Sequence, residues 1–325
     1  MSAATSSEDD EAWARTLAAA YRADARYLWG LCYRMVGSAA GADDLVHECF
    51  VRALQRRPEG RDGGLRPWLT RAAMNLAIDA LRRRKRAPYE GPWLPEVIDT
   101  GGEDAAAAIE RREGLTIGFL TLLEALSPQQ RAVVVLREIY EMSVEETAAI
   151  LGTSAGSVKV AHHRARARLG ERHAEAPTPA AGERHAAALF ALFEAIGSGE
   201  PARVAAALTE DAATFSDGGG LVRAARRVVQ GADDVARLLC GLAKKGGAPQ
   251  GIGLREVNLL PSLEITRVPA DSRDAGRMIV QVGMGEDGRV SAIYFVMAPA
   301  KLGGIDRRGP APPRGAVAAM LARAG

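Results

Sequence analysis

The sequence predicts a multidomain protein with two all-α domains, the second containing a helix-turn-helix, followed by an α+β domain. Residues 11–173 carry apolar side chains at helical spacing, interrupted by a segment rich in proline and glycine. After residue 183 the pattern changes, because amphipathic helices are followed by strand-like runs. A length of 325 residues suits two or three domains, and a hydrophobic fraction of 47% is sufficient for their cores.

The first domain is expected at residues 11–86 as a set of helices. Residues 11–36 form one or two amphipathic helices, and residues 41–56 form the next, with acidic residues at its start. A third helix, residues 67–86, begins with a proline and ends in five basic residues. Trp68, near the start of this helix, is interpreted as a core residue.

A linker is expected at residues 87–108 and a second helical domain at residues 109–173. The linker contains three prolines and three glycines, which exclude a regular periodic element. In the second domain, residues 109–126 are expected to form a helix. Ser127 then caps the next helix, with Gln130 three residues later in the arrangement of a capping box.

The stretch 143–170 indicates two short helices joined by a tight turn. Ser143 caps the first helix, Gly152 lies at the turn and Ser154 caps the second helix. The second helix has an apolar side made of Val158, Ala161, Ala165 and Leu169. Its other side carries Ser157, Lys159, His162, His163, Arg164, Arg166 and Arg168. This pattern favours a helix-turn-helix that enters a DNA major groove, and a helical hairpin with a solvated basic face is the alternative.

The charge distribution favours a nucleic-acid partner. The net charge is only +2, but arginines concentrate in residues 52–86 and 159–172, whereas residues 8–11 and 99–113 are rich in acids. Basic blocks of this kind suit a phosphate backbone.

The cysteines and the hydropathy exclude several other classes of protein. Cys32, Cys49 and Cys240 lack the spacing of metal ligands, so we expect reduced thiols and no metal site. No apolar run is long enough to span a membrane, and the N-terminal residues lack the pattern of a signal peptide. These features predict a cytoplasmic protein without a membrane segment.

Two blocks of the sequence resemble a known family. DDLVHECFVRAL followed by PWLTRAAMNLAIDALRRRKR resembles regions 2.1 to 2.4 of bacterial extracytoplasmic-function sigma factors, and SPQQRAVVVLREIYEMSVEETAAILGTSAGSVKVAHHRARARL resembles their region 4. The occurrence of both blocks in this order, separated by a short linker, is strongly specific for this family. The resemblance implies a non-enzymatic subunit without cofactors that binds RNA polymerase core and directs it to promoter DNA. Region 2 would then occupy residues 11–86 and region 4 residues 109–173.

The resemblance also implies roles for individual residues. The DDLVHE surface would dock on the clamp helices of the large catalytic polymerase subunit through Asp44, Leu45 and Glu48. The helix at 67–86 would hold the opened −10 element through Arg71, Asn75, Arg82 and Arg83. The last helix of region 4 would contact the −35 element through Ser157, Lys159, His163 and Arg164. A solvated helix face is the alternative for each arginine.

The third domain is expected at residues 183–310, after a linker at 176–183. Its helices are followed by a short strand at 213–216, a helix near 232–244 and four more strand-like runs. These four runs are Leu254–Leu260, Leu263–Val268, Met278–Gly283 and Val290–Met297. Their order resembles SnoaL-like domains, which are α+β cones with a central pocket.

Two short motifs resemble those of the sigma factors that carry a fused SnoaL-like domain. The linker contains Tyr89 and a WLPE sequence, Trp93-Leu94-Pro95-Glu96, which resembles a WLPEP motif with valine in place of the second proline. Asp217-Gly218-Gly219-Gly220 resembles DGGGK, with Leu221 replacing the lysine, and APAKL at 298–302 aligns with NPDKL. The resemblance implies that the linker and the 217–220 loop meet in a regulatory contact between domains.

Three functions are weighed. The first is a sigma factor regulated by its fused domain. The cone of that domain is then a candidate binding site for a small-molecule ligand. The second is a ligand-responsive helix-turn-helix regulator, which would need no polymerase-docking helix. The third is a SnoaL-like cyclase or isomerase fused to DNA-binding helices. The absence of histidine between residues 190 and 300 argues against the third, because Asp211, Asp217 and Glu264 would lack an acid–base partner.

Overall fold

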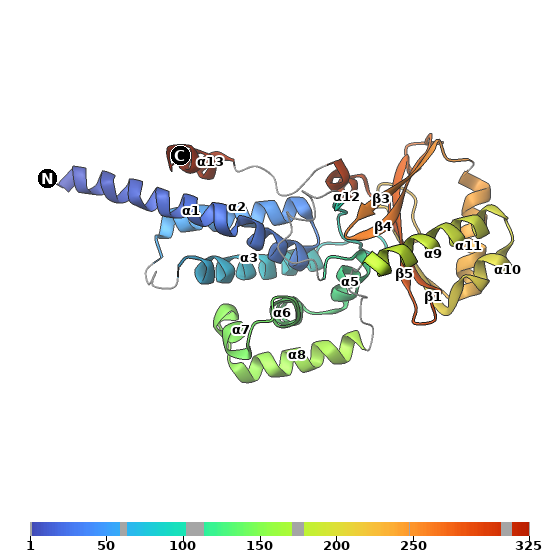
Figure 1. The fold of residues 1–325 in the computed structure, drawn as a ribbon, viewed down its shortest axis with the longest axis horizontal. Coiled ribbons are helices and arrows are strands. Elements are labelled where there is room, and N and C mark those ends of the chain that lie inside the picture. Colours follow the sequence, from blue (N-terminus) through green and yellow to red (C-terminus); the bar gives the residue numbers. More distant parts are fainter. Residues whose placement is uncertain are drawn as a thin grey trace.

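The computed structural model describes residues 2–58, 64–101, 114–170, 179–246, 248–306 and 314–324. The molecule is elongated, with the helical domains toward one end and a six-stranded sheet with its own helices at the other (Figure 1). In this described part of the chain, no helix is long and apolar enough to cross a membrane.

The first helical domain, called region 2 after the resemblance, contains three helices, α1 (Ser2–Val36), α2 (Ala39–Arg56) and α3 (Arg66–Arg86). The predicted helix at 11–36 is therefore part of one longer helix. Ser38 caps α2, because its side-chain oxygen accepts a hydrogen bond from the Gly41 N–H at 3.0 Å. The apolar faces of the three helices form one buried cluster, and Trp68 packs partly buried against it, as predicted.

Region 4 follows as a series of short helices. They are α5 (Ile117–Leu122), the 3-10 turn η2 (Leu123–Ala125), α6 (Pro128–Val134), the π-helical turn η3 (Val135–Ile139), α7 (Val144–Leu151) and α8 (Ala155–Leu169). Ser127 forms the predicted capping box with Gln130, and Ser143 forms a second one with Glu146. The helix-turn-helix is α7 and α8, with Gly152 in the left-handed conformation between them.

The prediction of one helix at 109–126 is wrong over residues 114–116 and again after Leu122, where α5 ends and the 3-10 turn η2 follows. The helix begins at Ile117, because Thr116 caps it by accepting a hydrogen bond from the Phe119 N–H at 3.2 Å. Apolar periodicity alone does not register this cap, since Leu115 is buried although it lies before the helix. Residues 109–113 lie outside the described part of the chain.

The third domain is an α+β fold, as predicted. Its strands are β1 (Leu208–Asp217), β2 (Val229–Gln230), β3 (Gly251–Val257), β4 (Leu260–Thr266), β5 (Arg277–Met284) and β6 (Val290–Val296). The spatial order is β2-β1-β6-β5-β4-β3, in which β3 to β6 form an antiparallel meander and β1 runs parallel to β6. The helices α9 (Pro179–Gly197), α10 (Pro201–Ala206) and α11 (Ala232–Gly246) lie on the side of the sheet away from the helical domains (Figure 1).

Several predicted boundaries in this domain are wrong. The strand expected at 254–260 ends at Val257, because Asn258 and Leu259 have φ of 50° and 68° and turn the chain into β4. The strand expected at 213–216 extends back to Leu208. The predicted linker at 176–183 is helical from Pro179 onward, and residues 176–178 lie outside the described part.

The chain then returns to region 2. Helix α12 (Pro299–Leu302) and the 3-10 turn η4 (Gly303–Asp306) lie beside the linker, and α13 (Gly315–Ala324) packs against α1 and α2. Val317 and Met320 of α13 belong to the large buried cluster that regions 2 and 4 share. In the described part of the tail, α13 is therefore docked on the helical domains (Figure 1).

Candidate functional site at the linker junction and on helices α2, α3 and α8

The linker from 87 to 101 lies between all three domains. It has no regular secondary structure, apart from one antiparallel bridge between Asp99 and Val257 at the end of β3. The five residues from Leu94 to Ile98 are all buried. A segment that avoids helix and strand yet buries its side chains must satisfy its polar groups through neighbouring elements.

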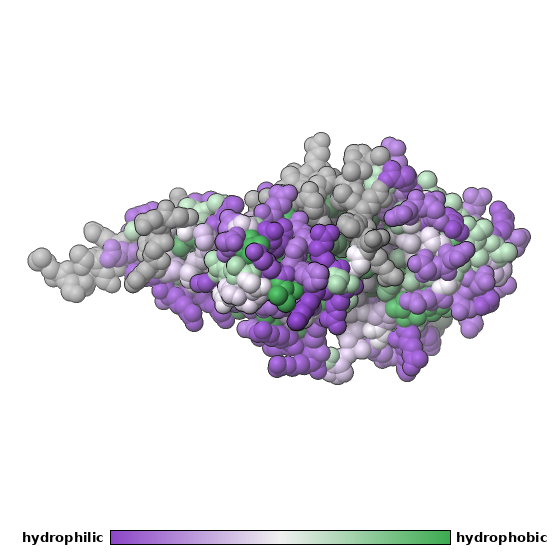
Figure 2. All heavy atoms as spheres, turned by 90° about the horizontal axis from the view of Figure 1, so that it is seen from below, coloured by the Kyte–Doolittle hydropathy of each residue, from purple (hydrophilic) through white to green (hydrophobic). Residues whose placement is uncertain are grey.

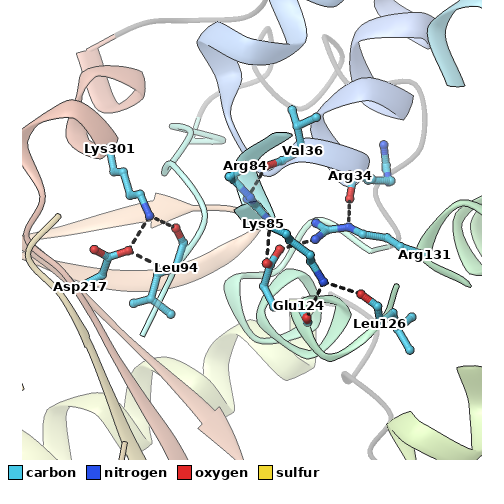
Figure 3. Close-up of polar contacts among 10 residues, drawn as sticks. All are labelled: Arg34, Val36, Arg84, Lys85, Leu94, Glu124, Leu126, Arg131, Asp217 and Lys301. Atoms are coloured by element: carbon cyan, nitrogen blue, oxygen red, sulfur yellow. Dashed lines mark hydrogen bonds and ion pairs between the residues drawn. The ribbon is translucent and has the colours of Figure 1, made fainter. Parts of the chain in front are cut away.

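Asp217, at the end of β1, satisfies several of these groups. Its carboxylate is fully buried and accepts hydrogen bonds from the Tyr89 hydroxyl at 2.5 Å and from the Leu94 N–H at 2.7 Å. It also forms an ion pair with the Lys301 ammonium, which donates a second hydrogen bond to the Leu94 carbonyl (Figure 3). Tyr89, Leu94 and Asp217, predicted to share a regulatory contact, are therefore brought together.

Lys301 is the buried cation of this cluster. Burial lowers the pKa of its ammonium from the ordinary 10.5 to about 8, against the opposing attraction of Asp217. The ammonium also lies 4.8 Å from the Tyr89 ring centroid and 4.2 Å from that of Trp93. Burial and the neighbouring Asp217 together raise the pKa of the Tyr89 hydroxyl, so it remains a donor at neutral pH.

Trp93 lies between two cations and the end of α1. The Arg84 guanidinium, which belongs to region 2, stacks over the Trp93 ring with its carbon 3.7 Å from the ring centroid. Lys301, the other cation, belongs to α12. A Cβ added to Gly37, which has φ of 64°, would come within 2.4 Å of the Trp93 ring. This close approach requires glycine at position 37 and fixes the ring against region 2.

The glycines that follow Asp217, Gly218 to Gly220, hold its carboxylate in place. A Cβ on Gly218 would lie 2.3 Å from the Val222 carbonyl oxygen, while Gly219 and Gly220 have positive φ. The Gly219 N–H donates to Asp217 at 2.9 Å, and Gly220 faces Glu90 of the linker. Pro95 is buried in the adjoining linker.

Asn258 is a junction residue that the sequence reasoning missed. Its fully buried amide donates to the Tyr33 hydroxyl of α1 at 2.8 Å and to the Leu115 carbonyl of region 4 at 2.7 Å, and accepts from the Ile98 N–H at 3.1 Å. One side chain on the β3–β4 turn thus contacts region 2, region 4 and the linker. The signal was an asparagine, which tolerates positive φ, inside an apparent strand.

A second polar cluster joins region 2 directly to region 4 (Figure 3). Glu124 pairs with Arg84 of α3 at 2.5 Å and with Arg131 of α6, whose side chain is 1% exposed. Burial would raise the pKa of Glu124, but the two guanidiniums outweigh it and hold the pKa below its ordinary value. Lys85 completes the contact by donating to the carbonyls of Glu124 and Leu126.

The four residues predicted at the −10 element, Arg71, Asn75, Arg82 and Arg83, are all exposed on α3. Arg82 forms an exposed ion pair with Asp79. Arg71 also donates a hydrogen bond to the Ala149 carbonyl in α7. Part of the proposed −10 surface therefore faces region 4.

The −35 candidates lie together on α8. Ser157, Lys159, His163 and Arg164 are all exposed, and the Ser157 N–H at the helix start donates to the Ser154 side chain at 3.1 Å. An open hollow lined by Ser127, Gln130, Ser154, Ser157 and Arg164 borders this end of the helix. The face of the molecule seen from the α7–α8 side is mostly hydrophilic with small apolar patches (Figure 2).

The polymerase-docking candidates lie on α2. Asp44 is exposed and pairs with Arg314, Glu48 is half-buried and pairs with Arg52 at 2.7 Å, and Leu45 is only 7% exposed. Leu45 is thus part of the apolar cluster to which α13 contributes.

Comparisons with known proteins match these domains. The Sigma-70 region 2 family matches residues 20–87, and the Sigma-70 region 4 family matches residues 118–169. The chain is 38% identical to the RNA polymerase sigma-E factor of Streptomyces avermitilis, over 42% of this chain and 74% of that protein.

One relative resembles most of the chain. The extracytoplasmic-function RNA polymerase sigma factor SigJ of Mycobacterium tuberculosis is 29% identical, over 86% of this chain and 91% of the relative. The crystal structure of SigJ superposes with a TM-score of 0.71 and 28% identity, covering 88% of this chain and 98% of that one. The likeness therefore extends through the sheet domain.

Proposed function

The chain belongs to the extracytoplasmic-function RNA polymerase sigma factors, non-enzymatic proteins that direct transcription initiation, and we propose that its sheet domain restrains promoter engagement by binding the linker. The observation that carries this proposal is Asp217, which binds Tyr89, Leu94 and Lys301 at one buried carboxylate. A buried, hydrogen-bonded ion pair imposes one geometry, because breaking it leaves an uncompensated charge.

The restraint acts on the relative placement of regions 2 and 4. In the packed arrangement Arg71 contacts α7, and Arg84 and Lys85 contact region 4, so the −10 surface is partly occupied. The linker contacts favour this arrangement over one in which the two regions separate. A contact within one chain operates at an effective concentration on the order of millimolar, so it is populated even when weak.

The remaining roles follow from the resemblance to the family. Asp44, Leu45 and Glu48 bind the clamp helices of polymerase core. Arg71, Asn75, Arg82 and Arg83 hold the opened −10 element, and Ser157, Lys159, His163 and Arg164 contact the −35 element. A small-molecule ligand of the sheet domain remains a prediction from its SnoaL-like pattern.

The acids of the sheet domain support a structural role. Asp217 pairs with Lys301, and Glu264 pairs with Arg255 and Arg277. Asp211 accepts a hydrogen bond from Thr209 at 2.9 Å. Carboxylates held in this way are poor general acids, which agrees with a regulatory domain.

The test is run-off transcription with added polymerase core. We expect Asp217→Asn, which removes the charge that Lys301 requires, to raise initiation at limiting sigma factor. Asp271→Asn is the matched control, because its ion pair with Arg223 lies exposed on the same domain. Equal initiation by the wild type and both variants would overturn the proposed restraint, whereas no core-dependent initiation by any of them would overturn the assigned residue roles as well.

A further inference from the structure

The region 2 surface proposed to bind polymerase core carries an occupant from the same chain. Helix α13 packs against α1 and α2, and its Val317 and Met320 are 0% and 4% exposed. Arg314, which directly precedes α13, forms an ion pair with Asp44. In Figure 1, α13 lies beside α1 and α2, well away from the sheet domain that precedes it in sequence.

The contacts of α13 use the same chemistry that a polymerase helix would use there. A basic side chain pairs with Asp44, and the apolar side chains of α13, which packs on α1 and α2, belong to the same buried cluster as Leu45. Two helices cannot pair with one carboxylate and cover one apolar surface together. We propose that α13 is an intramolecular competitor of polymerase core for the Asp44–Leu45 surface, and that core must displace it to bind.

This inference rests on the proposed roles of Asp44, Leu45 and Glu48. The apolar side chains carry most of the contact, because the Arg314–Asp44 pair is more than 60% exposed on both sides and such pairs contribute little. Released from its surface, α13 loses its helix, since isolated helices shorter than about 12 residues are marginal in water. Docking is therefore coupled to folding, which suits an occupant that a tighter partner can replace.

Two variants of α13 carry the same new charge, one on the docked face of the helix and one on its exposed face. Met320→Asp places a charge on the buried face, whereas Ala319→Asp places the same charge on the exposed face one residue earlier. We expect Met320→Asp to tighten full-chain binding to polymerase core by about tenfold, equivalent to about 1.4 kcal/mol, and Ala319→Asp to leave it unchanged. Circular dichroism and thermal unfolding check that the rest of the chain keeps its fold.

A peptide of residues 314–325 provides a second measurement that does not depend on the folding of a variant. We expect it to inhibit core binding by a protein truncated after Asp306, and the Met320→Asp peptide to inhibit much less. Equal core binding by wild type, Met320→Asp and the truncated protein, with no inhibition by the peptide, would overturn the competition while the proposed function stands. Absence of core binding by every protein would overturn both.

Discussion

Helices α3 and α8 are the two proposed DNA-facing helices, and they differ in how much of their basic surface is used inside the molecule. On α3, three basic side chains contact region 4, namely Arg71, Arg84 and Lys85. On α8, the described intramolecular contacts of the basic face are a hydrogen bond between His162 and Glu138 and an ion pair between Arg166 and Glu138. The −35 helix is thus presented to solvent while the −10 helix is partly engaged, so separation of the regions matters most for the −10 contacts.

The largest effect is expected from removing the carboxylate of Glu124, which joins α3 to α6 and so keeps α3 engaged with region 4. Glu124→Ala leaves the guanidinium of Arg131 buried without its carboxylate, and we expect the free energy of unfolding to fall by about 3–5 kcal/mol. Glu138→Ala, at the more exposed pairs of α8, should cost about 1 kcal/mol or less. Urea unfolding measures both, and similar losses would contradict the difference between the helices.

Asn258→Gly tests the junction without straining its backbone, because glycine accepts the positive φ of this turn. The variant removes the bonds to Tyr33, Leu115 and Ile98, and we expect a loss of about 2–3 kcal/mol from buried groups left unpaired. Hydrogen exchange should rise in the linker and at the start of region 4. Unchanged protection there would show that the turn does not hold the three parts together.

Lys159→Ala and Arg164→Ala test the open helix. Because both side chains are exposed, each substitution should weaken binding to −35 DNA by about 1–3 kcal/mol if the side chain reads a base, without changing the unfolding free energy. A phosphate contact lowers affinity for all sequences and reduces the salt slope, whereas a base contact relaxes specificity at one position. If neither change alters DNA binding, the assigned face of α8 is wrong.

The pH dependence of stability tests the Lys301 environment with the smallest expected effect. The folded chain releases the Lys301 proton near its lowered pKa of about 8, whereas the unfolded chain keeps it to about 10.5. Between these values the unfolded state binds more protons, so this group makes the free energy of unfolding rise with pH, by about 1 kcal/mol from pH 7 to pH 9. We expect Lys301→Met to lack this rise; parallel pH profiles would contradict the lowered pKa.

Local patterns predicted the helical domains well, because helix caps, apolar periodicity and the basic face of α8 each depend on residues close together in sequence. The capping box of Ser127 and the helix-turn-helix are examples. The start of α5 and the end of β3 were missed because a cap at Thr116 and positive φ at Asn258 override continuous apolar runs.

The junction was predictable only in part. The resemblance placed Asp217 and the linker together, but Asn258 and the role of Lys301 depend on contacts between residues far apart in sequence. The same holds for α13, which docks on α1 and α2 far from it in sequence. Long-range packing of this kind has no local signature to read.

The central claim is that linker binding by the sheet domain favours the packed placement of regions 2 and 4. Spin labels on cysteines introduced at Gln55 of α2 and Ala167 of α8, both exposed, report the distance between the regions by pulsed electron resonance. We expect one distance in the wild type, a second and longer one in Asp217→Asn, and the longer one alone with polymerase core and promoter DNA. The same single distance in all three samples would contradict the account.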